Sequence, residues 1–130
     1  MLMEIKGTYT WLITGGAGFI GSHIAHLLIE KEQKVIIFDD LSSGNLHNIR
    51  DIQDKITFIK GDIAQKTDLE NLPKNIDYIL HLAAQISVPQ SIVNPSQTFS
   101  TNTQGTLNIL EFAKSIKAKK VVLSSSAAVY

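Results

Sequence analysis

Short apolar runs recur along the chain, and longer segments of mixed apolar and polar residues separate them. Five of these runs have the length and composition of strands, at residues 10–14, 34–38, 56–59, 78–82 and 121–123. Nearly continuous apolar runs of this kind are typical of parallel strands that are buried on both faces. The pattern therefore predicts a parallel sheet in the interior of the protein.

The segments between the runs predict helices. Residues 19–31 have the spacing of an amphipathic helix, with apolar positions Ile20, Ile24, Leu27 and Leu28. Residues 95–117 predict a long helix, because Pro95 suits a first turn and apolar residues follow at Leu107, Ile109, Leu110, Phe112 and Ala113. Residues 68–72 predict a short helix, and the polar segment 41–54 predicts a loop with a short helical turn.

Strands that alternate with helices indicate parallel βαβ units with right-handed crossovers. We predict a single α/β domain, a Rossmann-type doubly wound sheet in three layers (α/β/α) with strand order 3-2-1-4-5. A chain of 130 residues suits one such domain. In this architecture ligands bind at the carboxyl ends of the strands.

A glycine-rich turn follows the first predicted strand, where residues 14–21 read TGGAGFIG. Gly15, Gly18 and Gly21 are three residues apart, and Gly16-x-Gly18-x-x-Gly21 also satisfies the dinucleotide fingerprint. Glycines here allow a sharp bend, a close approach of a pyrophosphate and tight packing of helix on strand. The phosphates then lie on free N–H groups of the next helix. The alternative is an ordinary tight turn, and the strand–turn–helix context favours the dinucleotide site.

Acidic residues close the second and third predicted strands. Asp39 lies eighteen residues after Gly21, where a carboxylate accepts hydrogen bonds from ribose hydroxyls and repels a 2′-phosphate. Asp40 adds negative charge, and no arginine follows before Arg50, so NAD is favoured over NADP. Asp62 is a candidate acceptor for an adenine amino group. The alternatives are that Asp39 and Asp40 cap an exposed turn and that Asp62 is a surface residue.

The fourth and fifth predicted strands end in small and hydroxyl residues. Residues 82–85 (LAAQ) allow a cofactor to lie flat against the backbone, and the hydroxyls of residues 124–126 face the crevice of a nicotinamide. Without a histidine partner these serines suit hydrogen bonding and proton relay, or they merely satisfy backbone groups. His81 is expected to be a packed core histidine. The remaining histidines have no acidic partner at convincing spacing, so we expect no metal site.

Composition excludes several classes of function. The chain has 12 basic and 12 acidic residues and no basic stripe, so we expect no nucleic-acid partner. It has no cysteine, which excludes disulfides, thiolate catalysis and zinc–sulfur sites. Its apolar runs are too short to span a bilayer, and its first residues do not resemble a secretory signal. We therefore expect a soluble, cytoplasmic protein that does not act at a membrane.

Six motifs in order carry a resemblance to a known family: TGGAGFIGSH at 14–23, FDDLSSG at 38–44, GDI at 61–63, HLAAQ at 81–85, NTQGT at 102–106 and SSSAAVY at 124–130. They are similar to the N-terminal part of extended short-chain dehydrogenase/reductases, in the NAD-dependent nucleotide-sugar epimerase/dehydratase family. Members hold NAD tightly, move a hydride from a sugar carbon to it, and return the hydride to the other face.

The resemblance implies a role for each matching residue. The implied pyrophosphate cradle consists of Gly15, Gly18, Phe19, Ile20 and Gly21. The implied adenosine site consists of Asp39, Asp40, Leu41, Ser42, Ser43 and Gly44 at the ribose, and Asp62 and Ile63 at the adenine. The implied nicotinamide side consists of Leu82, Ala83, Ala84 and Gln85, with Ser124 nearby and Asn102 ordering the region. Ser126 matches the catalytic Ser/Thr that hydrogen-bonds the sugar hydroxyl.

The string SSSAAVY narrows the resemblance. Dehydratases of the family carry Asp-Glu after the catalytic residue, and decarboxylases keep the glutamate, whereas Ala127 and Ala128 occupy these positions here. Alanine cannot move protons, so the string is most similar to UDP-glucose 4-epimerases and their UDP-N-acetylglucosamine- and uronate-acting relatives. Tyr130 is expected to pack and not to be the catalytic tyrosine.

The family's catalytic Tyr-x-x-x-Lys and its C-terminal sugar-binding domain lie beyond the part of the family that residues 1–130 match. We therefore expect an NAD-binding portion with almost no turnover of its own, whose parent acts on a nucleotide sugar. The alternatives are a non-catalytic dinucleotide-binding or regulatory module and an NADP-dependent reductase of the same superfamily. A bare edge strand and an unpaired long helix favour a homodimer or self-association.

Overall fold

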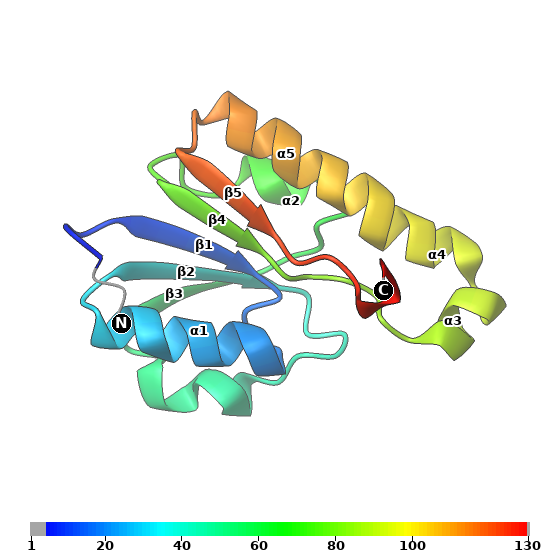
Figure 1. Ribbon diagram of the computed structural model, residues 1–130, viewed down its shortest axis with the longest axis horizontal. Helices are drawn as coiled ribbons and strands as arrows, with labels where there is room; N and C mark the ends of the chain where they lie inside the picture. The colour runs from blue at the N-terminus through cyan, green and yellow to red at the C-terminus, as the bar shows by residue number, and fades with distance from the viewer. Residues whose placement is uncertain (1–4, 130) are drawn as a thin grey trace.

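Five parallel strands form one sheet in the computed structural model, which describes residues 5–129 (Figure 1). The strands are β1 (Thr10–Thr14), β2 (Lys34–Asp39), β3 (Ile56–Lys60), β4 (Tyr78–His81) and β5 (Lys120–Leu123). Their order is β3-β2-β1-β4-β5, and every pairing is parallel. The predicted doubly wound class and strand order are confirmed. Tyr130 lies outside the described residues, as does the expectation that it packs.

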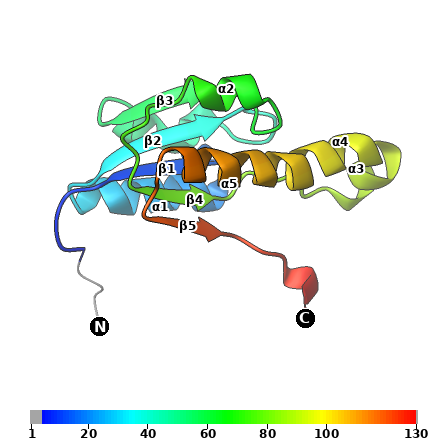
Figure 2. The same cartoon turned by 90° about the horizontal axis from the view of Figure 1, so that it is seen from above.

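The helices cover both faces of the sheet. One face carries α1 (Phe19–Glu30) and the 3-10 helix η1 (Leu46–Ile52), and the other carries α2 (Lys66–Glu70) and α5 (Gly105–Ser115) (Figures 1 and 2). Beyond the sheet lie α3 (Val88–Val93), α4 (Pro95–Phe99) and the π-helical turn η2 (Ser100–Gln104), with the 3-10 turn η3 (Ala127–Val129) near the C-terminus. The expected helical turn within 41–54 is η1.

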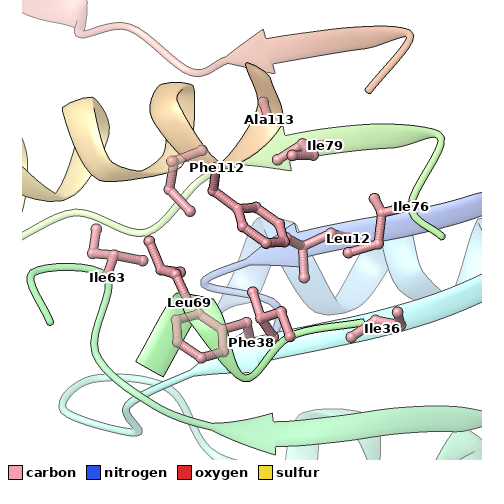
Figure 3. Packing of buried hydrophobic residues seen from close by; sticks show 11 residues of the cluster. Leu12, Ile36, Phe38, Ile63, Leu69, Ile76, Ile79, Phe112 and Ala113 are labelled. Carbon is pink, nitrogen blue, oxygen red and sulfur yellow. The ribbon is translucent and has the colours of Figure 1, made fainter. Parts of the chain in front are cut away.

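Two apolar clusters fill the space between the sheet and its helices. Successive strand residues point to opposite faces, so Leu12 packs beneath α2 and α5 whereas Ile13 packs beneath α1. Figure 3 shows the first cluster, in which Phe112 of α5 lies over strand residues such as Leu12 and Phe38. This two-sided burial explains why the strands are continuous apolar runs.

The long helix predicted over 95–117 is confirmed as one unbroken helical segment, which α4, the π turn η2 and α5 form without a gap from Pro95 to Ser115. The structure adds α3, which the apolar pattern did not predict. Asn94 separates α3 from α4 with φ −137° and ψ 74°, because a residue before proline is disfavoured in the helical region. Its side chain caps α4 by accepting from the Gln97 N–H. Since α3 buries none of its residues, it left no apolar period in the sequence.

Several apolar residues at helical spacing are not buried. On α1, Ile20 and Leu27 are more than half exposed, and the buried face is made by Gly21, Ser22, Ala25 and Leu28. Small residues replace large ones there because α1 lies close against the glycine turn. Leu107 and Leu110 on α5 are each 48% exposed.

The edge of the sheet formed by β5 is open, and the C-terminal segment runs away from it (Figure 2). Val122 and Leu123 are about half exposed on this strand. We predict that the 130-residue chain self-associates at high concentration, because bare edge strands and apolar surface promote association. Light scattering over a concentration series measures this, and a monodisperse monomer at the highest concentration would contradict the prediction.

Candidate functional site

A pocket of about 350 Å³ opens at the carboxyl ends of the strands. Most of the predicted cofactor residues line it, namely Gly15, Gly18, Phe19, Ile20, Gly21, Asp39, Asp40, Ser42, Ser43, Gly44, Ile63, Leu82, Ala83, Ala84 and Ser124. Four further residues line the pocket that the sequence did not predict as site residues, namely Phe38, Gly61, Ile86 and Thr101. Segments more than a hundred residues apart in the chain, such as those of Gly15 and Ser124, therefore meet in the pocket.

Five predicted site residues do not line the pocket, namely Leu41, Asp62, Gln85, Asn102 and Ser126. The first four shape its walls through hydrogen bonds. The Leu41 N–H donates to Asp39, and Asp62 accepts from the Ala64 N–H at 2.8 Å. Asn102 and Gln85 exchange two bonds, at 2.7 and 2.9 Å, between the Asn102 side chain and the Gln85 backbone. Ser126 is exposed on the segment after β5.

The glycine turn brings the end of β1 against the segment that follows β4. Gly15 has φ +70°, and a Cβ atom on it would lie 2.8 Å from the Ala83 nitrogen. Gly21 begins the buried face of α1, where a Cβ would lie 2.7 Å from the Cα of Gly16. The predicted sharp bend is therefore at Gly15, and at Gly21 the helix packs closely against the glycine turn that follows β1.

The first turn of α1 presents backbone N–H groups to the pocket. Gly18 is the N-cap, the turn has no side-chain cap, and it contains no acidic residue. Phe19, Ile20 and Gly21 therefore occupy the positions whose N–H groups have no partner inside the helix, and all three line the pocket. Together with the helix dipole this arrangement favours an anion.

Asp39 is buried at the end of β2, with 6% of its surface exposed. Its Oδ2 accepts from the Ala17 N–H at 2.9 Å, and its Oδ1 accepts from the Leu41 N–H at 2.8 Å. The carboxylate thus fixes the glycine turn and the loop after β2 to each other. Each oxygen keeps a lone pair for a further donor on the pocket side.

His81 is a packed, hydrogen-bonded residue of β4, as predicted, with 3% of its surface exposed. Its Nδ1 lies 2.7 Å from the Thr14 hydroxyl, and its Nε2 lies 3.0 Å from the Thr106 hydroxyl. Burial lowers the pKa of the imidazole below its ordinary value.

We predict that this histidine makes the protein less stable in mild acid. The folded-state pKa is the lower one, so the unfolded chain takes up the proton first as pH falls below about 6.5. The contribution of neutral His81 to the unfolding free energy is complete above that pH. It is lost as pH falls toward the folded-state pKa, with a slope of at most about 1.4 kcal/mol per pH unit. Urea unfolding between pH 7 and 5 measures it, and an equal slope in His81→Asn would contradict the prediction.

The start of α5 fastens the loop that follows β3. The Asn108 side chain is buried and donates to the carbonyls of Ile63 and Ala64, at 2.9 and 3.2 Å. A Cβ on Gly105 would lie 2.7 Å from the Ile63 side chain, so this glycine makes room for a pocket residue. The sequence analysis missed Asn108, since its partners lie some 45 residues away in the chain.

Replacing Asn108 by alanine is expected to cost about 2 kcal/mol of unfolding free energy, because a buried carbonyl, that of Ile63, and a partly buried one, that of Ala64, lose their donor. Gln104→Ala is the matched control. It removes only the bond that Asn108 accepts, at an exposed position, and should cost less than about 0.5 kcal/mol. Urea unfolding of both variants measures the difference. Equal stabilities would contradict the role given to the Asn108 donor.

No group of three metal-ligating side chains capable of holding an ion occurs among residues 5–129. Within the same described part of the chain, no helix is long and apolar enough to cross a membrane.

Comparison with known proteins assigns the chain to a family. The sequence model of a family described as GDP-mannose 4,6 dehydratase matches residues 12–130, which include every motif of the pocket. The chain belongs to the nucleotide-sugar epimerase/dehydratase family. The assignment confirms the resemblance inferred from the motifs.

Three relatives that match this chain are described as 4-epimerases. The chain is 38% identical over 129 residues to the bifunctional UDP-glucose 4-epimerase and UDP-xylose 4-epimerase 3 of Arabidopsis thaliana, covering 92% of this chain and 37% of that protein. The structure of UDP-N-acetylglucosamine 4-epimerase from Methanobrevibacter ruminantium M1, in complex with UDP-N-acetylmuramic acid, superposes with a TM-score of 0.86 at 42% identity, covering 95% of this chain and 39% of that one.

A third relative was crystallised with the dinucleotide. UDP-glucose 4-epimerase from Thermus thermophilus, in complex with NAD, superposes with a TM-score of 0.82 at 34% identity, covering 90% of this chain and 37% of that one. The chain therefore spans less than two fifths of the length of these relatives.

Proposed function

We propose that the chain is the NAD-binding portion of a UDP-sugar 4-epimerase. The observation that carries the proposal is the joint placement of the α1 N-terminus and the Asp39 carboxylate on one pocket at the carboxyl ends of the strands. A dinucleotide needs an anion site for its pyrophosphate and an acceptor for its ribose hydroxyls, and the pocket offers both.

The residues present fit NAD. The free N–H groups at Phe19, Ile20 and Gly21 suit the pyrophosphate, and the remaining lone pairs of Asp39 suit the adenosine ribose. Ile63, held in place by Asn108, suits the face of the adenine. The Asp39 and Asp40 carboxylates repel a 2′-phosphate, which favours NAD over NADP.

In this proposal the nicotinamide half of NAD lies along Leu82, Ala83 and Ala84, which line the pocket together with Ser124. When bound, NAD supplies a two-electron acceptor and donor for the sugar carbon. The chain's own part is to hold the dinucleotide and to place the Ser126 hydroxyl, which would hydrogen-bond the sugar hydroxyl. We propose that residues 1–130 alone turn over no sugar, because no tyrosine–lysine pair at the family spacing follows Ser126 in them.

Ala127 and Ala128 support an epimerase over a dehydratase. Elimination of water needs an acid and a base beside the sugar, and alanine supplies neither. The relatives compared above are 4-epimerases, in keeping with this choice.

The test uses a protein in which these residues are joined to a Tyr-x-x-x-Lys at the family spacing. It should interconvert UDP-glucose with UDP-galactose, or the corresponding N-acetyl sugars, with no net consumption of NAD. Formation of a 4-keto-6-deoxy sugar would overturn the epimerase assignment. Tighter binding of NADP than of NAD would instead favour a reductase.

A further inference from the structure

A chain of hydrogen bonds runs through His81 from the glycine turn to the π turn η2. At one end the Thr14 hydroxyl accepts from the Leu82 and Ala83 N–H groups, at 3.2 and 3.3 Å, and the Leu82 N–H is shared with the Thr14 carbonyl at 3.2 Å. Both lone pairs of this oxygen are then used, so its own proton must go to the His81 Nδ1 at 2.7 Å. That nitrogen therefore carries no proton.

At the other end of this series of hydrogen bonds, the contacts require a proton on the second ring nitrogen of His81, Nε2. The Thr106 hydroxyl lies 2.7 Å from the Asn102 carbonyl, which can only accept, so the hydroxyl proton points there. The His81 Nε2, 3.0 Å from the same oxygen, must then donate. Together the two ends select one form of the ring, the neutral imidazole with its proton on Nε2.

The segments joined by this chain of bonds form one wall of the pocket. Ala83 and Ala84 lie on the pocket after β4, and Thr101 lies on it from η2. The Asn102 side chain joins the same two segments a second time through its two hydrogen bonds to the Gln85 backbone. Thr101 and Asn102 both belong to the π turn, a kind of helical irregularity frequent at functional sites.

We infer that His81 is a positioning residue, which as the neutral Nε2–H form ties the segment after β4 to η2 and so holds the nicotinamide side of the pocket. The role of His81 in holding the nicotinamide side rests on the proposed function. The protonation state of its ring does not depend on that proposal. A proton on Nδ1 would compete for the Thr14 hydroxyl oxygen and release the Ala83 N–H group, whereas the Leu82 N–H group would keep its bond to the Thr14 carbonyl.

Nitrogen-15 NMR of the imidazoles tests the state of the ring in the unmodified 130-residue chain at pH 7.5, without NAD. The chain has four histidines, so His81 is assigned by its loss in His81→Asn. We expect its Nε2 to be protonated and its Nδ1 not. A protonated Nδ1, or a doubly protonated ring, would overturn the inference whatever the variants do.

Thr106→Val tests the coupling, with Thr106→Ser as the control that keeps the hydroxyl. We expect Thr106→Val to speed amide hydrogen exchange at Ala83 and to weaken NAD binding about ten-fold, and Thr106→Ser to match the unmodified chain. Unchanged exchange at the Ala83 amide in Thr106→Val would overturn the inference. Failure of the unmodified chain to bind NAD would overturn the proposed function, while the exchange rates would still decide the coupling.

Discussion

Asp39→Ala is expected to reduce NAD affinity at least 100-fold and to lower the unfolding free energy by about 3 kcal/mol. The affinity falls because the charged acceptor for the ribose hydroxyls is lost. The stability falls because the N–H groups of Ala17 and Leu41 lose a buried partner, at about 1–3 kcal/mol each. Calorimetric titration with NAD and urea unfolding measure the two effects.

Two further variants separate the roles of Asp39. Asp39→Asn keeps one carboxamide oxygen as an acceptor, so it should lose less stability than Asp39→Ala while losing discrimination against NADP. Asp51→Ala removes the same charge at an exposed site outside the pocket and should change both quantities little. If Asp39→Ala behaved like Asp51→Ala, the carboxylate would have neither role.

Gly15→Ala is expected to cost about 3–4 kcal/mol of unfolding free energy and to abolish NAD binding. The left-handed backbone at φ +70° costs about 1 kcal/mol for alanine, and the added Cβ would lie 2.8 Å from the Ala83 nitrogen. Backbone cannot yield as a flexible side chain can, so the wall formed by Ala83 and Ala84 must shift. Urea unfolding and calorimetric titration measure the loss.

Gly7→Ala is the matched control for the cost of placing alanine at a positive φ. Gly7 also has positive φ, at +96°, but a Cβ there would meet the Tyr9 side chain no closer than 3.4 Å. It should cost only about 1 kcal/mol and leave NAD binding intact. Equal losses in the two variants would show that the approach to Ala83 is unimportant.

The parts of the site that sequence predicted are those with a local signal. The glycine turn has a fixed spacing after a strand, and Asp39 closes the next strand, so the fold class alone brings both to one edge of the sheet. The strand order followed from the alternation of continuous apolar runs and helical segments.

The remainder depends on contacts that no local pattern encodes. Asn108 reaches Ile63 across 45 residues, and Thr14 reaches His81 across 67, so these partners meet only in the fold. The exposed helix α3 leaves no apolar period, and no local pattern marks residues 100–104 as the π turn within the long helical segment. Exposed Leu27 and Leu107 match helical spacing without belonging to the core.

Calorimetric titration of the 130-residue chain with NAD and with NADP tests the central claim most directly. The joint placement of the α1 N-terminus and Asp39 predicts saturable binding of one NAD per chain and clearly weaker binding of NADP, and Asp39→Ala should remove the NAD signal. Absence of NAD binding by the folded chain, or binding of NADP as tight as that of NAD, would contradict the claim.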